Sequence, residues 1–123
     1  MFQLVVFDLD GTLIDSRRDL ANATNALLAD YGAAPLPEDR IGRMVGDGAA
    51  TLVARAFDAA GIQRPPDALA RFLKIYSAHL LDHTRPYPGM TGVLGVLGEP
   101  FLCEGQREIS AFGGWRAYVA SQK

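Results

Sequence analysis

Two aspartates near the N-terminus carry the strongest chemical signal in the sequence. Asp8 and Asp10 stand two residues apart, after the apolar run at 4–7 and before Gly11 and Thr12. In an extended segment residues i and i+2 point the same way, so the two carboxylates are expected to face one spot. Carboxylates that close repel each other unless a hard divalent cation such as Mg²⁺ offsets their charge, and this cation also attracts phosphate oxygens. One carboxylate can then attack phosphorus while the other transfers a proton.

The same residues also fit a polar turn without a catalytic role, which is the better interpretation of a bare Asp-x-Asp. The longer context favours catalysis, because an apolar strand, the run F-D-L-D-G-T-L and a helix start follow one another. The apolar run predicts a strand buried on both faces, as in a parallel sheet. Open α/β sheets bind ligands beyond the carboxyl ends of their strands. The sequence therefore predicts a site at the end of the first strand.

Hydrophobic periodicity predicts about four helices and no strand over residues 16–83. Ser16 and Asp19 have the spacing of a capping box at the start of the first helix. The turn-rich segment 84–89 is expected to return the chain to 13–16, so that it enters and leaves the helical insert close together. Residues 90–97 predict a further short helix. Residues 98–123 contain no apolar run comparable to 4–7, so we expect an incomplete sheet and a tail that is not core-like, as in a truncated protein.

Composition narrows the function classes. The 123 residues are 49% hydrophobic and 21% charged, with a formal net charge of −2, so we expect no nucleic-acid or membrane partner. The single cysteine, Cys103, excludes an internal disulfide and fits a reducing cytosol. The apolar start is too short for a signal peptide or a membrane span. We expect a cytoplasmic, soluble protein.

The run Phe7-Asp-Leu-Asp-Gly-Thr-Leu13 resembles the first motif of the haloacid-dehalogenase superfamily of phosphatases. The segments 15–20, 45–49 and 85–89 are similar to its bacterial phosphoglycolate phosphatase branch, and the likeness covers residues 1 to about 97. The resemblance implies an α/β fold, namely the N-terminal piece of a Rossmann-like core with a helical cap insert. In that scheme residues 1–15 are the first strand and catalytic loop, 16–84 the cap, and 85–97 the return hinge and core helix. The chain itself would be mostly α.

The resemblance also implies roles for individual residues. Asp8 would be the nucleophile that forms an aspartyl-phosphate, and Asp10 the general acid/base. Mg²⁺ would be bound by the Asp8 side chain and the Asp10 backbone carbonyl. Gly11 and Thr12 would contact the substrate, a small phosphorylated metabolite that the likeness suggests is 2-phosphoglycolate.

Candidates within the helical insert leave alternatives open. Gly46, Asp47 and Gly48 could form a cap loop over the substrate or simply an interhelical turn. Arg55 could bind a substrate anion through a bidentate contact or be a solvated side chain. His79 and His83, at i and i+4, could place two metal ligands on one helix face, although no third ligand stands nearby.

The family's later motifs have no counterpart in the sequence. Members carry a Ser or Thr after the second strand, then a Lys, then an acidic pair that completes the metal site. Parts that act as a unit lose most activity when several are missing. The alternative hypothesis is therefore a catalytically inactive fragment, a helical cap with a remnant of the core.

Overall fold

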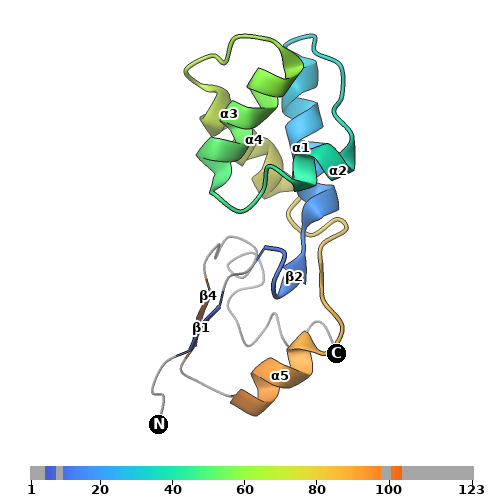
Figure 1. Ribbon diagram of the computed structural model, residues 1–123, viewed down its shortest axis with the longest axis vertical. Coiled ribbons are helices and arrows are strands. Elements are labelled where there is room, and N and C mark those ends of the chain that lie inside the picture. The colour runs from blue at the N-terminus through green and yellow to red at the C-terminus, as the bar shows by residue number, and fades with distance from the viewer. Residues whose placement is uncertain (1–4, 8–9, 98–100, 104–123) are drawn as a thin grey trace. The chain divides into compact units, whose positions relative to one another are not determined.

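The computed structural model describes residues 5–7, 10–97 and 101–103 (Figure 1). Its elements follow the order β1 (Val5–Phe7), β2 (Ile14–Asp15), α1 (Arg17–Asp30), α2 (Glu38–Gly42), α3 (Ala49–Ala60), α4 (Ala68–Ala78), β3 (Arg85–Pro86), α5 (Met90–Leu97) and β4 (Phe101–Cys103). The chain divides into a helical unit, Arg17–His83, and a strand unit, Met1–Ser16 with Thr84–Lys123. Within the described ranges, no helix combines the length and apolar character that a membrane span requires.

The helical unit contains four helices and no strand, as the hydrophobic periodicity predicts. Helix α1 packs against α2, α3 and α4, and α3 packs against α4. Each helix turns an apolar stripe inward, because residues spaced three and four apart share one face. The largest fully buried apolar side chains of the unit are Leu27, Leu28, Ile41, Val53, Phe57 and Phe72. The buried apolar cluster runs from Leu20 to Leu80, so the helical unit has a core of its own.

Aromatic contacts link the far end of α1 to α3 and α4. The rings of Tyr31 and Phe57 meet edge to face, with centroids 5.5 Å apart. The Arg71 guanidinium lies 5.3 Å from the centroid of the Tyr31 ring and donates to its hydroxyl at 2.8 Å. This hydrogen bond raises the pKa of Arg71 above its ordinary value. Tyr31 therefore joins the apolar core to a polar contact at the surface.

Glycines end two of the helices where the sequence places them. Gly32 follows α1 with a φ of +73°, and Gly61 follows α3 with a φ of +70°. At the end of α3 the amide of Ile62 donates back to the carbonyl of Phe57 at 3.2 Å. This left-handed turn satisfies carbonyls that the helix leaves without partners, and glycine adopts it without a Cβ penalty.

One asparagine fixes the segment between α1 and α2. The Asn25 Nδ2 donates to the carbonyl of Leu36 at 2.9 Å, and the Leu36 amide donates to Asn25 Oδ1 at 2.8 Å. Leu36 is itself buried, so its backbone groups need partners other than water. The amide side chain thus pairs with an irregular segment as a neighbouring strand would.

The strand unit differs from the sequence-based expectation at one point. Strand β4, Phe101–Cys103, pairs in parallel with β1, with Phe7 opposite Cys103 (Figure 1). The expectation of a tail that is not core-like is therefore wrong for residues 101–103. Their apolar run is shorter than the run at 4–7 and contains no β-branched residue, so it does not indicate a strand by itself. The predicted helix over 90–97, by contrast, is confirmed as α5 with the same bounds.

A second, two-stranded pair joins the points where the chain enters and leaves the helical unit. Strands β2 and β3 are antiparallel, with Ile14 opposite Pro86 and Asp15 opposite Arg85. The Tyr87 amide also donates to the carbonyl of Leu13 at 3.0 Å. The predicted proximity of residues 13–16 and 84–89 is confirmed.

Candidate functional site

A tight turn follows β1 and carries Asp10. The Gly11 amide donates to the carbonyl of Ile14 at 2.9 Å, and Asp10 forms a bridge with the same residue. Gly11 has a φ of +78°, in the region that glycine adopts most easily. Leu13 and Ile14 are buried, and they anchor the turn from its far side. Gly11 and Thr12 are exposed at its tip.

Asp10 accepts a hydrogen bond that the spacing of the residues does not predict. The Ser16 hydroxyl donates to Asp10 Oδ1 at 2.6 Å, a length typical of a hydroxyl bound to a carboxylate. Ser16 is only 1% exposed, and Asp10 is half-buried. The predicted capping box uses the Ser16 oxygen as an acceptor at the start of α1, and the hydroxyl proton orients the carboxylate six residues earlier. Asp8, the predicted nucleophile, lies outside the described residues.

The donor chemistry at this turn fits a hard cation. Asp10 offers carboxylate and carbonyl oxygens, and Asp8 adds a second carboxylate by sequence. Oxygen ligands of this kind suit Mg²⁺ better than soft or nitrogen-preferring metals. Elsewhere in the described ranges, no three His, Cys, Asp or Glu side chains gather closely enough to form a metal site.

The other predicted contact residues lie in the helical unit, in the loop between α2 and α3. Gly46 and Gly48 have φ values of +119° and +90°. The Arg55 guanidinium donates to the carbonyl of Met44 at 3.0 Å and pairs with the Asp47 carboxylate at 2.8 Å. Arg55 therefore ties this loop to α3. Its side chain remains 42% exposed and that of Asp47 64% exposed, so both are within reach of solvent.

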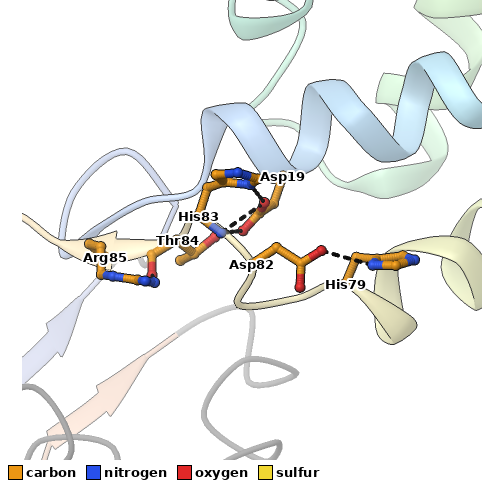
Figure 2. Close-up of polar contacts among 6 residues, drawn as sticks. All are labelled: Asp19, His79, Asp82, His83, Thr84 and Arg85. Atoms are coloured by element: carbon orange, nitrogen blue, oxygen red, sulfur yellow. Dashed lines mark hydrogen bonds and ion pairs between the residues drawn. The ribbon is translucent and has the colours of Figure 1, made fainter.

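The two histidines do not form the metal pair that their spacing suggests. Helix α4 ends at Ala78, and His79 is already outside it. The Nδ1 of His79 contacts Asp82 at 2.8 Å, whereas the Nδ1 of His83 contacts Asp19 at 2.9 Å (Figure 2). Side chains at i and i+4 share a face only in a continuous helix, and the chain from His79 to His83 is a loop.

Comparison with known proteins agrees with the arrangement after β1. The family model of the haloacid dehalogenase-like hydrolases matches residues 5–101. The phosphoglycolate phosphatase of Rhodospirillum rubrum is 47% identical over 105 residues, covering 79% of this chain and 44% of that protein. The phosphoglycolate phosphatase of Caulobacter vibrioides is 42% identical over 97 residues, covering 76% and 41% respectively.

Solved structures give the same fold. A crystal structure from Haemophilus somnus 129PT, described as a predicted phosphoglycolate phosphatase, has a TM-score of 0.71 at 25% identity. The match covers 96% of this chain and 60% of that one. The chain belongs to the haloacid dehalogenase-like hydrolase family. It spans less than half the length of the two curated relatives above.

Proposed function

We propose that this chain provides the catalytic loop and the cap of a phosphatase that hydrolyses a small phosphomonoester, with 2-phosphoglycolate as the preferred substrate. The observation that carries the proposal is the turn after β1, in which a buried hydroxyl orients the half-buried Asp10 carboxylate. The names of the similar proteins support the choice of substrate. The single cysteine supports a cytoplasmic location.

The mechanism uses the two aspartates in turn. Asp8 attacks phosphorus, a bond forms between its carboxylate oxygen and phosphorus, and the bond to the ester oxygen breaks. Asp10 gives its proton to the departing oxygen, which leaves as an alcohol. Water then attacks phosphorus while Asp10 takes a proton from it, so that inorganic phosphate leaves and Asp8 is regenerated. Mg²⁺, bound by Asp8 and Asp10, would supply positive charge to the phosphoryl oxygens.

Ser16 has a defined place in this scheme. A general acid must present its proton along one direction, and a hydrogen bond to Oδ1 restricts rotation of the Asp10 carboxylate. Ser16 is thus a positioning residue for Asp10.

The helical unit would select the organic part of the substrate. A cap that closes over a phosphomonoester excludes water and rejects molecules that do not fit. The loop at Gly46–Gly48 and the half-exposed Arg55 are the groups we propose for this contact. Their ion pair is exposed, and an exposed pair is weak enough to be exchanged for a ligand anion.

Phosphate release from 2-phosphoglycolate by the purified chain tests the proposal. We expect activity that requires Mg²⁺ and is lost in Asp8→Asn and Asp10→Asn, because an amide is a poor nucleophile and cannot transfer the proton. Asp58→Asn, an exposed aspartate on α3, is the matched control and should leave the rate unchanged. Undiminished turnover in Asp8→Asn would refute the mechanism.

The competing proposal is a helical cap without catalytic activity. What favours it is the coverage of 41% and 44% of the curated relatives, which leaves more than half of each without a counterpart. In that case all three variants and the unmodified chain would release phosphate at the same background rate.

A further inference from the structure

The buried carboxylate of Asp19 and the histidine His83 connect the first and last parts of the helical unit. Asp19 lies in the first turn of α1 and is 1% exposed, and His83 is the last residue of the unit. The His83 amide donates to both oxygens of Asp19, at 3.1 and 2.9 Å, and the ring Nδ1 contacts Oδ1 at 2.9 Å (Figure 2). A backbone amide only donates, so Asp19 accepts both of the hydrogen bonds from the His83 amide.

Burial makes this contact costly to break. A carboxylate removed from water is strongly destabilising unless donors replace the lost hydration. Here donors from His83 converge on Asp19 across 64 positions of sequence. The nearby pair of His79 and Asp82 has similar chemistry, yet both of its side chains are more than half exposed. In the first pair the His83 side chain is 42% exposed, and it is the buried Asp19 carboxylate that makes the contact costly to lose.

The entering and returning chain segments are therefore held together within each unit, on either side of the connection between the units. On the strand unit's side, β2 and β3 pair through Asp15 and Arg85. On the helical unit's side, Asp19 holds His83. Between the strand pair and the contact of Asp19 with His83, the entering chain contains Ser16 and the first residues of α1. The returning chain contains Thr84 alone. Ser16 and Thr84 are small and buried, with exposures of 1% and 2%.

We propose that the contact between Asp19 and His83 is a clasp that confines the pivot of the cap to Ser16 and Thr84. With the clasp closed, residues 79–83 move with the helices and cannot act as additional hinge residues. Hinges are usually a few residues at the ends of elements, and the clasp sets how many there are. The proposal does not depend on the chemistry at Asp10.

Motion in the unmodified chain tests where the pivot lies. ¹⁵N relaxation dispersion detects backbone motion on the microsecond-to-millisecond timescale of hinge movements. We expect exchange broadening at Ser16 and Thr84, with residues 79–83 as quiet as the interior of α4. Broadening throughout 79–83, or its absence at Ser16 and Thr84, would overturn the proposal.

Variants test whether the clasp is responsible. In Asp19→Ala, broadening should spread into 79–83, and the His83 amide should exchange with solvent at least about tenfold faster, because it loses its acceptor. His83→Ala keeps the backbone donor and should have an intermediate effect. Asp82→Ala removes an aspartate from the same loop and should match the unmodified chain.

The test does not depend on Asp19→Ala being folded. If Asp19→Ala loses its dispersed NMR spectrum, His83→Ala against Asp82→Ala carries the comparison, since the backbone hydrogen bonds to Asp19 remain. Equal exchange and equal broadening in those two variants would show that the contact between Asp19 and His83 does not control the pivot.

Discussion

Replacing Asn25 by alanine should destabilise the helical unit although no apolar contact is lost. The change removes the partners of both backbone groups of Leu36, which is buried. Each hydrogen bond contributes about 1 kcal/mol net, and a buried group left without a partner costs about 1–3 kcal/mol. Alanine returns roughly 0.5 kcal/mol through its higher helix propensity. Both hydrogen bonds are only partly buried, so at about 1–1.5 kcal/mol each, less the propensity gain, we expect a net loss of about 1.5–2.5 kcal/mol in the free energy of unfolding.

The helix itself offers a matched control. Asn22 lies one turn earlier on α1 and is exposed, so Asn22→Ala gains helix propensity and leaves the hydrogen bonds between Asn25 and Leu36 in place. Urea unfolding followed by circular dichroism at 222 nm should show opposite signs for the two variants. A loss of this size lowers Tm by roughly 10 °C in a unit of this length. If the free energies of unfolding of Asn25→Ala and Asn22→Ala differed by less than about 0.5 kcal/mol, the two hydrogen bonds between Asn25 and Leu36 would contribute nothing measurable.

Two further predictions concern the same unit. Phe57→Ala should cost about 3–5 kcal/mol, because it empties a fully buried site and removes the edge-to-face contact with Tyr31, and a change under about 1 kcal/mol in urea unfolding would contradict this packing. Gly61→Ala should cost about 1 kcal/mol, because its φ of +70° is unfavourable for alanine although its Cβ would meet nothing within 4 Å. Gly42→Ala, where φ is not positive and the nearest atom to a new Cβ is 3.8 Å away, should be neutral or stabilising; equal Tm shifts for the two glycine variants would refute the distinction.

The features that could be predicted from sequence are those fixed within a few residues. The apolar stripes of α1, α3 and α4 and the glycine that ends α3 follow from local spacing alone. Helix α5 was predicted at its observed bounds for the same reason. The proximity of residues 13–16 and 84–89 followed from the need to return the chain after an insert, whereas their pairing as strands β2 and β3 was not predicted.

The features that the sequence did not indicate depend on distant partners. Ser16 and Asp19 have capping-box spacing, and each also has a partner that this spacing does not predict, namely Asp10 for Ser16 and His83 for Asp19. Those partners are 6 and 64 residues away. β4 was missed because its residues become a strand by pairing with β1, and three apolar residues do not indicate that by themselves. The predicted roles of Asp8 and of the loop at 46–48 stay predictions, and the phosphate-release assay above tests the first.

The chain enters and leaves the helical unit at neighbouring points, and this affects how the unit can change in evolution. Because Ile14 and Pro86 are paired neighbours, everything between them is attached to the strands at one point of the surface. A segment attached in this way can be lengthened, exchanged or transferred without altering the order of the strands that carry it, as is usual for inserted domains whose ends meet. The four helices also bring their own buried core, so the insert carries its packing with it. Under the role proposed above for the helical unit, a change of insert would change the substrate preference while the carboxylate turn stays as it is.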